Sequence, residues 1–274
     1  MKQQLLWIPV AVLMAVTSNA WAEDEGYLSL GIGMEHSSGK YGGTSTIEST
    51  SIPVSLRYAR DDWSLKLTVP YLSVTGDGSV IIDGVRGSGG MRMGIGMGGG
   101  GGGGGGTSTT TTTRVTNSGL GDASLFASYT LWQNEAGDAG VDVGARVKFG
   151  TANAKLGSGE NDYAVQTSGY VAFGDLTPSL MLGYEKLGSS ATVQLDSAAY
   201  ASAGLDYLLS DESNLGVEYW YAQQASATGY AQKEVSLYAA TQVGEDSYLR
   251  AFVMKGLSDG SPDTGYGVSL SSGF

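Results

Sequence analysis

The chain has 274 residues and a formal net charge of −12, with 27 acidic side chains against 15 basic ones. This acidic excess argues against nucleic-acid binding, which needs a basic surface, and the absence of cysteine excludes disulfide and thiolate chemistry. Glycine reaches 44 residues, and the 16 tyrosines outnumber the 5 phenylalanines. Such a composition is typical of the wall of a barrel with a wet interior.

Residues 1–22 have the pattern of a secretory signal peptide. Lys2 supplies a positive charge, residues 5–16 are almost entirely apolar, and Ala20-Trp21-Ala22 forms a small-x-small cleavage site. The apolar run is shorter than the roughly 20 residues that a helix needs to cross a bilayer. No later segment reaches about 18 consecutive apolar residues. We therefore expect an exported chain, residues 23–274, that is one domain and not a helical membrane protein.

From residue 26 onward, apolar side chains recur at every second position in segments separated by turn residues. Period two predicts strands with one apolar and one polar face. Most segments have the roughly 9–11 residues that a tilted strand needs to cross a membrane. Twelve strands are predicted, over residues 26–36, 46–60, 63–75, 117–132, 140–151, 162–174, 177–187, 192–209, 214–224, 230–243, 248–256 and 264–274. The expected fold is an all-β, twelve-stranded antiparallel outer-membrane β-barrel.

Eleven charged residues lie on the polar faces of these strands. A charge on the lipid face near the membrane midplane costs about 2–4 kcal/mol, so the polar faces are expected to point inward. There they would line a lumen and set its selectivity, or fill it. The inward charges are Arg57, Lys66, Asp122, Asp142, Arg146, Lys148, Glu185, Asp206, Glu218, Glu234 and Arg250.

The order of these charges along the chain suggests two oppositely charged regions. Basic residues on neighbouring early strands suggest a basic stripe, and acidic residues on later strands suggest an acidic wall. If both hold, an electric field crosses the pore. For any single residue, structural packing within the lumen is an equally good interpretation. The basic set is Arg57, Lys66, Arg146 and Lys148, and the acidic set is Glu185, Asp206, Glu218 and Glu234.

The connections alternate between short turns and longer segments. An even number of strands places both termini on one side, and short turns lie on the periplasmic side in this architecture. The longest connection, residues 76–116, is therefore expected to be extracellular. Its glycine-rich part, residues 87–106, and the threonine tract at 107–113 predict a flexible surface loop.

Two features could carry other chemistry. A His-Ser-Ser sequence begins at His36, the single histidine, and a few barrel enzymes deacylate lipids with a His–Ser pair. No acid or amide is placed by the sequence to orient His36, and a solvated histidine is the simpler interpretation. Three methionines between residues 91 and 97 could bind copper(I) as soft ligands, but a disordered tract with incidental methionines is the preferred interpretation. We expect no metal, no cofactor and no enzymatic activity.

The chain ends on a strand with one apolar face. Tyr266, Val268, Leu270 and the terminal Phe274 share one parity, with small residues between them. This ending resembles the signal that outer-membrane barrels present to their assembly machinery. An ordinary amphipathic edge strand is the alternative.

The segment Ser118-Gly119-Leu120-Gly121-Asp122 opens a strand after the long connection, and Thr68-Val69-Pro70-Tyr71 lies in the strand before it. Together with the strand count and Phe274, these segments resemble the outer-membrane transporters associated with meta-pathway phenol degradation. The resemblance implies a channel for small, often aromatic or apolar molecules, and it carries over no catalytic residues. The polyglycine tract departs from the family's pattern.

The expected function is passage of small molecules through the outer membrane of a Gram-negative bacterium. The expected partners are membrane lipid, the barrel assembly machinery and a small-molecule solute, and no nucleic acid. The alternatives are a closed barrel that acts through its extracellular loops and, third, a barrel lipid hydrolase. A soluble exported β-sandwich also shows strand alternation.

Overall fold

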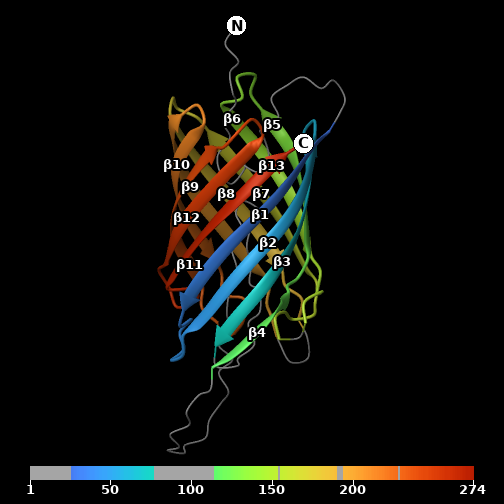
Figure 1. Cartoon of the computed structure of the whole chain (residues 1–274), viewed down its shortest axis with the longest axis vertical. Coiled ribbons are helices and arrows are strands. Elements are labelled where there is room, and N and C mark those ends of the chain that lie inside the picture. The colour runs from blue at the N-terminus through green and yellow to red at the C-terminus, as the bar shows by residue number, and fades with distance from the viewer. Residues whose placement is uncertain (1–25, 77–113, 154, 190–193, 228) are drawn as a thin grey trace, which may run out of the picture.

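The computed structural model describes residues 26–76, 114–153, 155–189, 194–227 and 229–274, which form an all-β structure (Figure 1). The predicted signal peptide and residues 77–113 of the long connection, with its methionines, lie outside the described residues. No helix in the described part of the chain is long and apolar enough to span a membrane. The strands are β1 (Tyr27–Gly39), β2 (Ile47–Arg60), β3 (Trp63–Gly76), β4 (Val115–Leu120), β5 (Ser124–Gln133), β6 (Ala139–Lys148), β7 (Asp162–Val171), β8 (Leu176–Lys186), β9 (Ala198–Ser210), β10 (Ser213–Ala222), β11 (Gln232–Gln242), β12 (Ser247–Gly256) and β13 (Thr264–Gly273).

The strands close into an antiparallel barrel. Neighbours in sequence pair with one another, and β1 pairs with β13, which joins the two ends of the sheet. Strands β4 and β5 both pair with β3, at different heights, so they occupy a single position in the wall. The thirteen strands therefore make a barrel of twelve positions, and the predicted twelve-stranded fold is confirmed. A sandwich of two sheets is excluded, because the sheet has no break.

The prediction of a single strand over residues 117–132 is wrong, because the structure divides this segment into β4 and β5. The pairing of this segment with β3 stops at Leu120 and resumes at Ser124. Three residues lie between these two positions, whereas only two residues of β3 lie between their partners, Tyr71 and Thr68. An extra residue in one strand is a β-bulge. Pro70 of β3 lies opposite the interruption and has no amide hydrogen to donate, but its carbonyl accepts a hydrogen bond of 2.8 Å from the Gly121 amide. In the described residues, β4 pairs with β3 and with no other strand.

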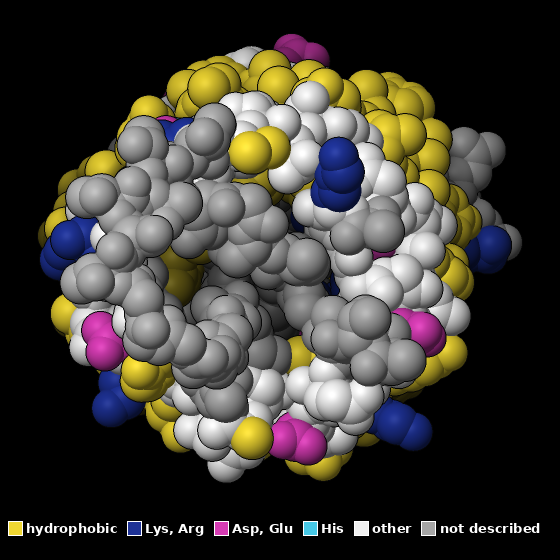
Figure 2. Space-filling view, turned by 90° about the horizontal axis from the view of Figure 1, so that it is seen from below, with side chains coloured by type: hydrophobic (Ala, Val, Ile, Leu, Met, Phe, Trp, Pro, Cys, Tyr) yellow, Lys and Arg dark blue, Asp and Glu magenta, His cyan; other side chains and the backbone are white. Residues whose placement is uncertain are grey.

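The barrel wall is apolar outside and mostly polar inside. In β1, Leu30, Ile32 and Met34 are each about half exposed on the outer face, whereas Gly31 and Glu35 are buried on the inner face. Figure 2, a view along the barrel, shows hydrophobic side chains around most of the circumference. Such an outward apolar band matches the hydrocarbon region of a membrane.

The two ends of the barrel differ in their connections. Short turns join β2 to β3, β5 to β6, β7 to β8, β9 to β10 and β11 to β12, and we call this the short-turn end. The opposite, long-loop end carries the connection between β3 and β4 and the other longer segments. Strand β1 begins and the chain finishes at the short-turn end (Figure 1), where the Phe274 amide donates to the Leu28 carbonyl at 3.0 Å. The alternation expected from the sequence is therefore present.

Most of the other strand boundaries differ from their predictions by three residues or fewer, and the largest difference is at the start of one strand. The strand predicted over 192–209 begins only at Ala198, and residues 194–197 are not part of a strand. Leu195 in this stretch instead packs against a buried apolar cluster inside the barrel. The apolar side chain in this segment therefore packs inside the barrel and is not part of a wall strand.

Candidate functional site

The eleven charged residues selected from the sequence all lie on the inner parity of their strands or, for Asp122, in the bulge. Their role in selectivity stays a prediction. The buried members are Arg57, Asp122, Lys148, Glu185, Asp206 and Glu234, and the half-buried members are Lys66, Asp142, Arg146, Glu218 and Arg250.

Two inward carboxylates and several inward aromatic residues are not among the residues predicted from the sequence. Glu35 shares its parity with Gly31 and lies opposite the apolar stripe of β1, so alternation could have found it. Asp162 is the first residue of β7, where strand boundaries are least certain from sequence. The aromatic side chains on the inner parity of the strands are Tyr27, Phe126, Tyr170, Tyr200, Trp220, Tyr238, Tyr248 and Phe252.

The inward charges lie at two levels. The loop-side belt lies toward the long-loop end and the turn-side belt lies three to five residues from the short-turn ends of its strands. The loop-side belt comprises Asp122, Arg146, Lys148, Asp162, Glu185 and Glu234, and the turn-side belt comprises Arg57, Lys66, Asp142, Asp206, Glu218 and Arg250.

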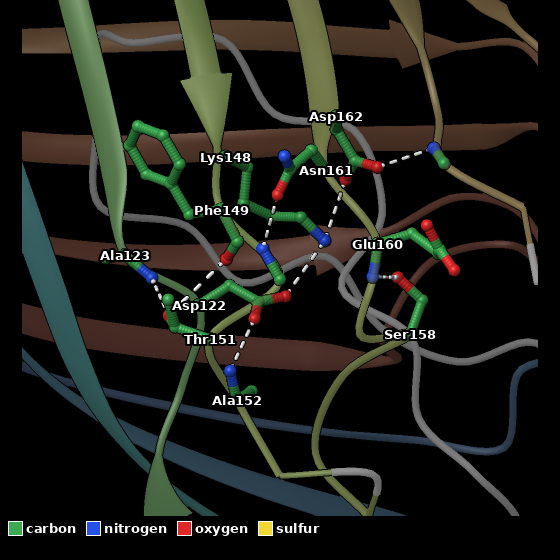
Figure 3. A network of polar contacts seen from close by, with 12 residues as sticks. Asp122, Ala123, Lys148, Phe149, Thr151, Ala152, Ser158, Glu160, Asn161 and Asp162 are labelled. Atoms are coloured by element: carbon green, nitrogen blue, oxygen red, sulfur yellow. Dashed lines mark hydrogen bonds and ion pairs between the residues drawn. The ribbon is translucent and has the colours of Figure 1, made fainter.

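Lys148 is the centre of the loop-side belt (Figure 3). Its Nζ lies 3.0 Å from Asp122 Oδ2 and 2.7 Å from Asp162 Oδ2, and all three side chains are almost fully buried. Asp122 Oδ1 accepts a hydrogen bond of 2.7 Å from the Ala152 amide, and Asp162 Oδ1 accepts one of 2.7 Å from the Gly188 amide. One ammonium thus ties together the bulge, the β6–β7 connection and the β8–β9 connection.

A second ion pair lies beside this triad. Arg146 Nη2 on β6 lies 2.6 Å from Glu185 Oε1 on β8, two strands away. Two members of the expected basic stripe are therefore paired directly with carboxylates at this level. The expected separation of charges into a basic stripe and an acidic wall does not hold in the loop-side belt.

Two apolar clusters line the long-loop half of the interior. In one, Leu156 of the β6–β7 connection packs against Tyr41, Ile47, Leu72 and Val74, so this connection folds inward over the inner faces of β2 and β3. The other cluster contains the stacked rings of Tyr200 and Trp220, with centroids 5.4 Å apart. Figure 2, seen from the long-loop end, shows hydrophobic side chains inside the barrel as well as around it.

The turn-side belt combines charges with aromatic rings. Asp206 Oδ1 accepts hydrogen bonds from the Tyr238 hydroxyl at 2.7 Å and from Asn214 Nδ2 at 2.8 Å. The Arg250 guanidinium lies over the Tyr238 ring, 4.6 Å from its centroid, and 5.8 Å from that of Phe252. Cations stacked on aromatic faces are held in place by the ring quadrupole.

On the other side of this belt, Arg57 and Lys66 lie directly opposite each other across the β2–β3 pair. Lys66 interacts electrostatically with Arg57 and Arg250, and with the carboxylate of Glu35. Directly opposite like charges repel each other in a sheet. This part of the belt therefore gathers positive charge.

His36 lies on the outer face of β1, near the long-loop end. Its Nδ1 lies 3.0 Å from Thr50 Oγ1, and its ring centroid is 5.3 Å from that of Tyr266. Ser37 is buried on the opposite, inner face. The described residues contain no cluster of three or more His, Cys, Asp or Glu side chains that could hold a metal ion.

No protein-family model matches the sequence, and a search of curated proteins finds no relative. Solved structures do resemble it. An outer membrane channel from Pseudomonas putida F1 aligns with a TM-score of 0.64 at 14% identity, over 94% of this chain and 100% of that one. The KdgM porin aligns at 0.53 and 13% identity over 90% and 99%, and the NanC porin at 0.52 and 10% over 89% and 98%. At these identities, the chain shares the barrel fold of outer-membrane channels.

Proposed function

We propose that this protein is an outer-membrane channel through which small molecules pass. The observation that carries the proposal is the combination of a closed barrel, an outer apolar band and an interior lined with charged and aromatic side chains. A barrel that served only as a scaffold would have no need of so many inward charges, since buried charges are costly unless paired or hydrated. The fold shared with a bacterial outer membrane channel and two porins adds support.

The proposed location is the outer membrane of a Gram-negative bacterium. The signal peptide expected in residues 1–22 supports export, and the outer apolar band suits a lipid environment. The assembly machinery would recognise the end of the chain, where an apolar outer face is formed by Tyr266, Val268, Leu270 and Phe274. In this orientation the long-loop end faces the outside of the cell.

Apolar or aromatic solutes fit the long-loop half of the interior best. Both apolar clusters lie there, and the stacked, buried rings of Tyr200 and Trp220 make this part of the interior apolar and aromatic. The sequence resemblance to transporters of phenol-degradation pathways points the same way. The charged belts would then select among the solutes that enter.

A closed barrel acting through its loops is the second candidate, and one observation favours it. Most side chains of the loop-side belt are buried, and the β6–β7 connection folds over the inner face of the wall. A lumen filled in this way would pass no solute. A lipid hydrolase has less support, because His36 contacts Thr50 and not a carboxylate, while Ser37 points to the other face of the wall.

Conductance in a planar bilayer separates the two candidates. The refolded protein is inserted under a salt gradient, and single-channel steps and the reversal potential are recorded. Discrete steps with an ion preference that Arg146→Ala or Glu218→Ala changes would establish an open pore lined by these residues. Silence from protein shown to be folded and inserted would contradict an ion-permeable pore and favour the closed barrel.

A further inference from the structure

The two belts differ in how far a solute could reach them. Within the loop-side belt, Lys148, Asp162 and Glu185 have almost no exposed surface, and their charges are held in the ion pairs described above. In the turn-side belt, Arg57 and Asp206 are also buried, but Lys66, Asp142, Glu218 and Arg250 are half-buried, whereas Arg146 is the one half-buried member of the loop-side belt. A solute inside the lumen would therefore meet more half-buried charges at the level of the turn-side belt, Lys66 and Glu218 among them.

The strands that carry the turn-side belt fall into two arcs around the barrel. The belt's cations, Arg250, Arg57 and Lys66, lie on β12, β2 and β3, a run of the wall that also includes β13 and β1. Its carboxylates lie on β6, β9 and β10, in the opposite run. Arg250, at one end of the basic arc, lies over the Tyr238 ring whose hydroxyl donates to Asp206. Among the inward side chains that the structure describes on the strands of this basic arc, there is one carboxylate, Glu35, which lies farther from the short-turn end along β1. The basic arc keeps a positive balance.

The strand order places the basic residues Arg57 and Lys66, the basic pole, across the lumen from Asp206 and Glu218, the acidic pole. From β2, the carboxylate-bearing β9 is reached through β3, β5, β6, β7 and β8 in one direction, and through β1, β13, β12, β11 and β10 in the other. Five wall positions intervene on each side, so Arg57 lies diametrically opposite Asp206. The same sequence of neighbours places Lys66 on β3 opposite Glu218 on β10.

The poles also lie at similar heights. Arg57 and Lys66 are each three residues from the short-turn ends of their strands, whereas Asp206 is four and Glu218 five residues from theirs. A strand rises about 3.3 Å per residue, so these heights differ by roughly 7 Å at most. Opposite charges facing each other across a narrow, low-dielectric lumen create a strong transverse field.

We propose that the turn-side belt selects small zwitterionic solutes by orienting their dipoles across the lumen. The carboxylate of the solute faces the half-buried Lys66, and its cationic group faces the half-buried Glu218, while the buried Arg57 and Asp206 add to the field on their respective sides. A solute with a single charge is attracted by one pole and repelled by the other, so it gains less from this arrangement. The inference rests on the proposed channel function and names the solute class that the channel favours.

The test uses solutes of nearly one shape that differ in charge. Betaine carries a quaternary ammonium and a carboxylate, dimethylbutanoate replaces that ammonium by an uncharged carbon, and choline keeps only the cation. Influx of each is measured in vesicles containing the full mature protein and normalised to arabinose, with protein-free vesicles as the background. We expect betaine to enter several-fold faster than either singly charged analogue.

Two variants test the poles separately. Lys66→Gln should raise choline influx relative to dimethylbutanoate, and Glu218→Gln should shift this ratio in the opposite direction. Lys255→Gln, which removes an exposed cation from the outer face of β12, is the matched control and should change neither ratio. The heat-dependent mobility of the barrel on gels checks that each variant is folded.

The outcomes separate the inference from the function on which it rests. If arabinose enters but the three charged solutes show no preference for betaine in the wild type, the zwitterion inference is wrong and the channel stands. This comparison does not depend on either variant folding. If a folded, inserted protein admits neither arabinose nor any charged solute, the channel function itself is refuted.

Discussion

Lys148 and Asp162 form an ion pair of 2.7 Å across the β6–β7 pair, and less than a tenth of either side chain is exposed. The same ammonium also faces Asp122, which belongs to the bulge between β4 and β5. Burial in pairs satisfies these charges, but it makes each of them dependent on the others. Removing the lysine would leave two carboxylates buried without their shared cation.

Lys148→Met should therefore destabilise the barrel strongly. Breaking a buried ion pair from one side costs about 3–5 kcal/mol, and here two carboxylates lose their partner. The free energy of unfolding, measured by denaturant titration in detergent or lipid, should fall by about that amount. Lys186→Met, at an exposed position at the end of β8, is the matched control. A loss of stability equal to that of the control would mean that the triad is hydrated and contributes little.

Leu156→Ala should loosen the β6–β7 connection from the inner face of β2 and β3. Leu156 is 3% exposed and packs against a cluster of buried apolar residues. Truncating a buried leucine costs about 2–5 kcal/mol, and the loss should fall mainly on this connection because the wall hydrogen bonds remain. In planar bilayers, we expect larger or more frequent conductance steps than in the wild type. Unchanged conductance in an active channel would place the constriction elsewhere.

Gly216→Ala should displace the Tyr238 ring. A methyl group at Gly216 would overlap the atoms of this ring, whose hydroxyl donates to Asp206. Overpacking of this kind costs about 1–3 kcal/mol. Gly169→Ala is the control, because its added carbon would lie 3.5 Å from the nearest atom, the Gly140 carbonyl oxygen. Equal stability of the two variants in thermal unfolding would show that the ring can move at no cost.

Ile32→Arg should weaken folding into lipid. Ile32 lies in the middle of β1 on the outer face, where it is 52% exposed. An arginine at the bilayer midplane of a barrel costs about 2–4 kcal/mol, and close to the interface about 0–1 kcal/mol. Thr264→Arg, at the long-loop end of β13, is the control for the second case. A folding equilibrium in vesicles that is equally insensitive to both changes would contradict the proposed membrane band.

The sequence predicted the fold and the inward charges because both depend on period two. In β3, for example, Lys66 alternates with apolar outward residues, and this fixes its face without any knowledge of its neighbours. Alternation carries no information about which strand lies across the lumen. The pairing of Arg146 with Glu185 depends on strand order and register, so it could not be read from the spacing of these residues.

The places where the structure departs from regular alternation could not be predicted from the alternation itself. The bulge before Ser124 shifts the parity within one apolar stretch, and its signal was present in Pro70 and Gly121, two residues that weaken a strand. The inward fold of the β6–β7 connection could not be predicted from periodicity, because Leu156 is the one large aliphatic residue in this segment and a single such side chain does not indicate what it packs against. Long-range packing and not local preference decides its position.

The interruption between β4 and β5 also affects how firmly the rim is held. A closed barrel has no free strand edges, but one edge of β4 is paired with β3 and no strand in the described residues pairs with the other. Backbone groups on such an edge rely on solvent or loops for their hydrogen bonds. Residues 115–120 should therefore be the part of the wall that opens first. In a hydrogen–deuterium exchange time course, their amides would take up deuterium ahead of those of β9 or β10, which are paired on both sides.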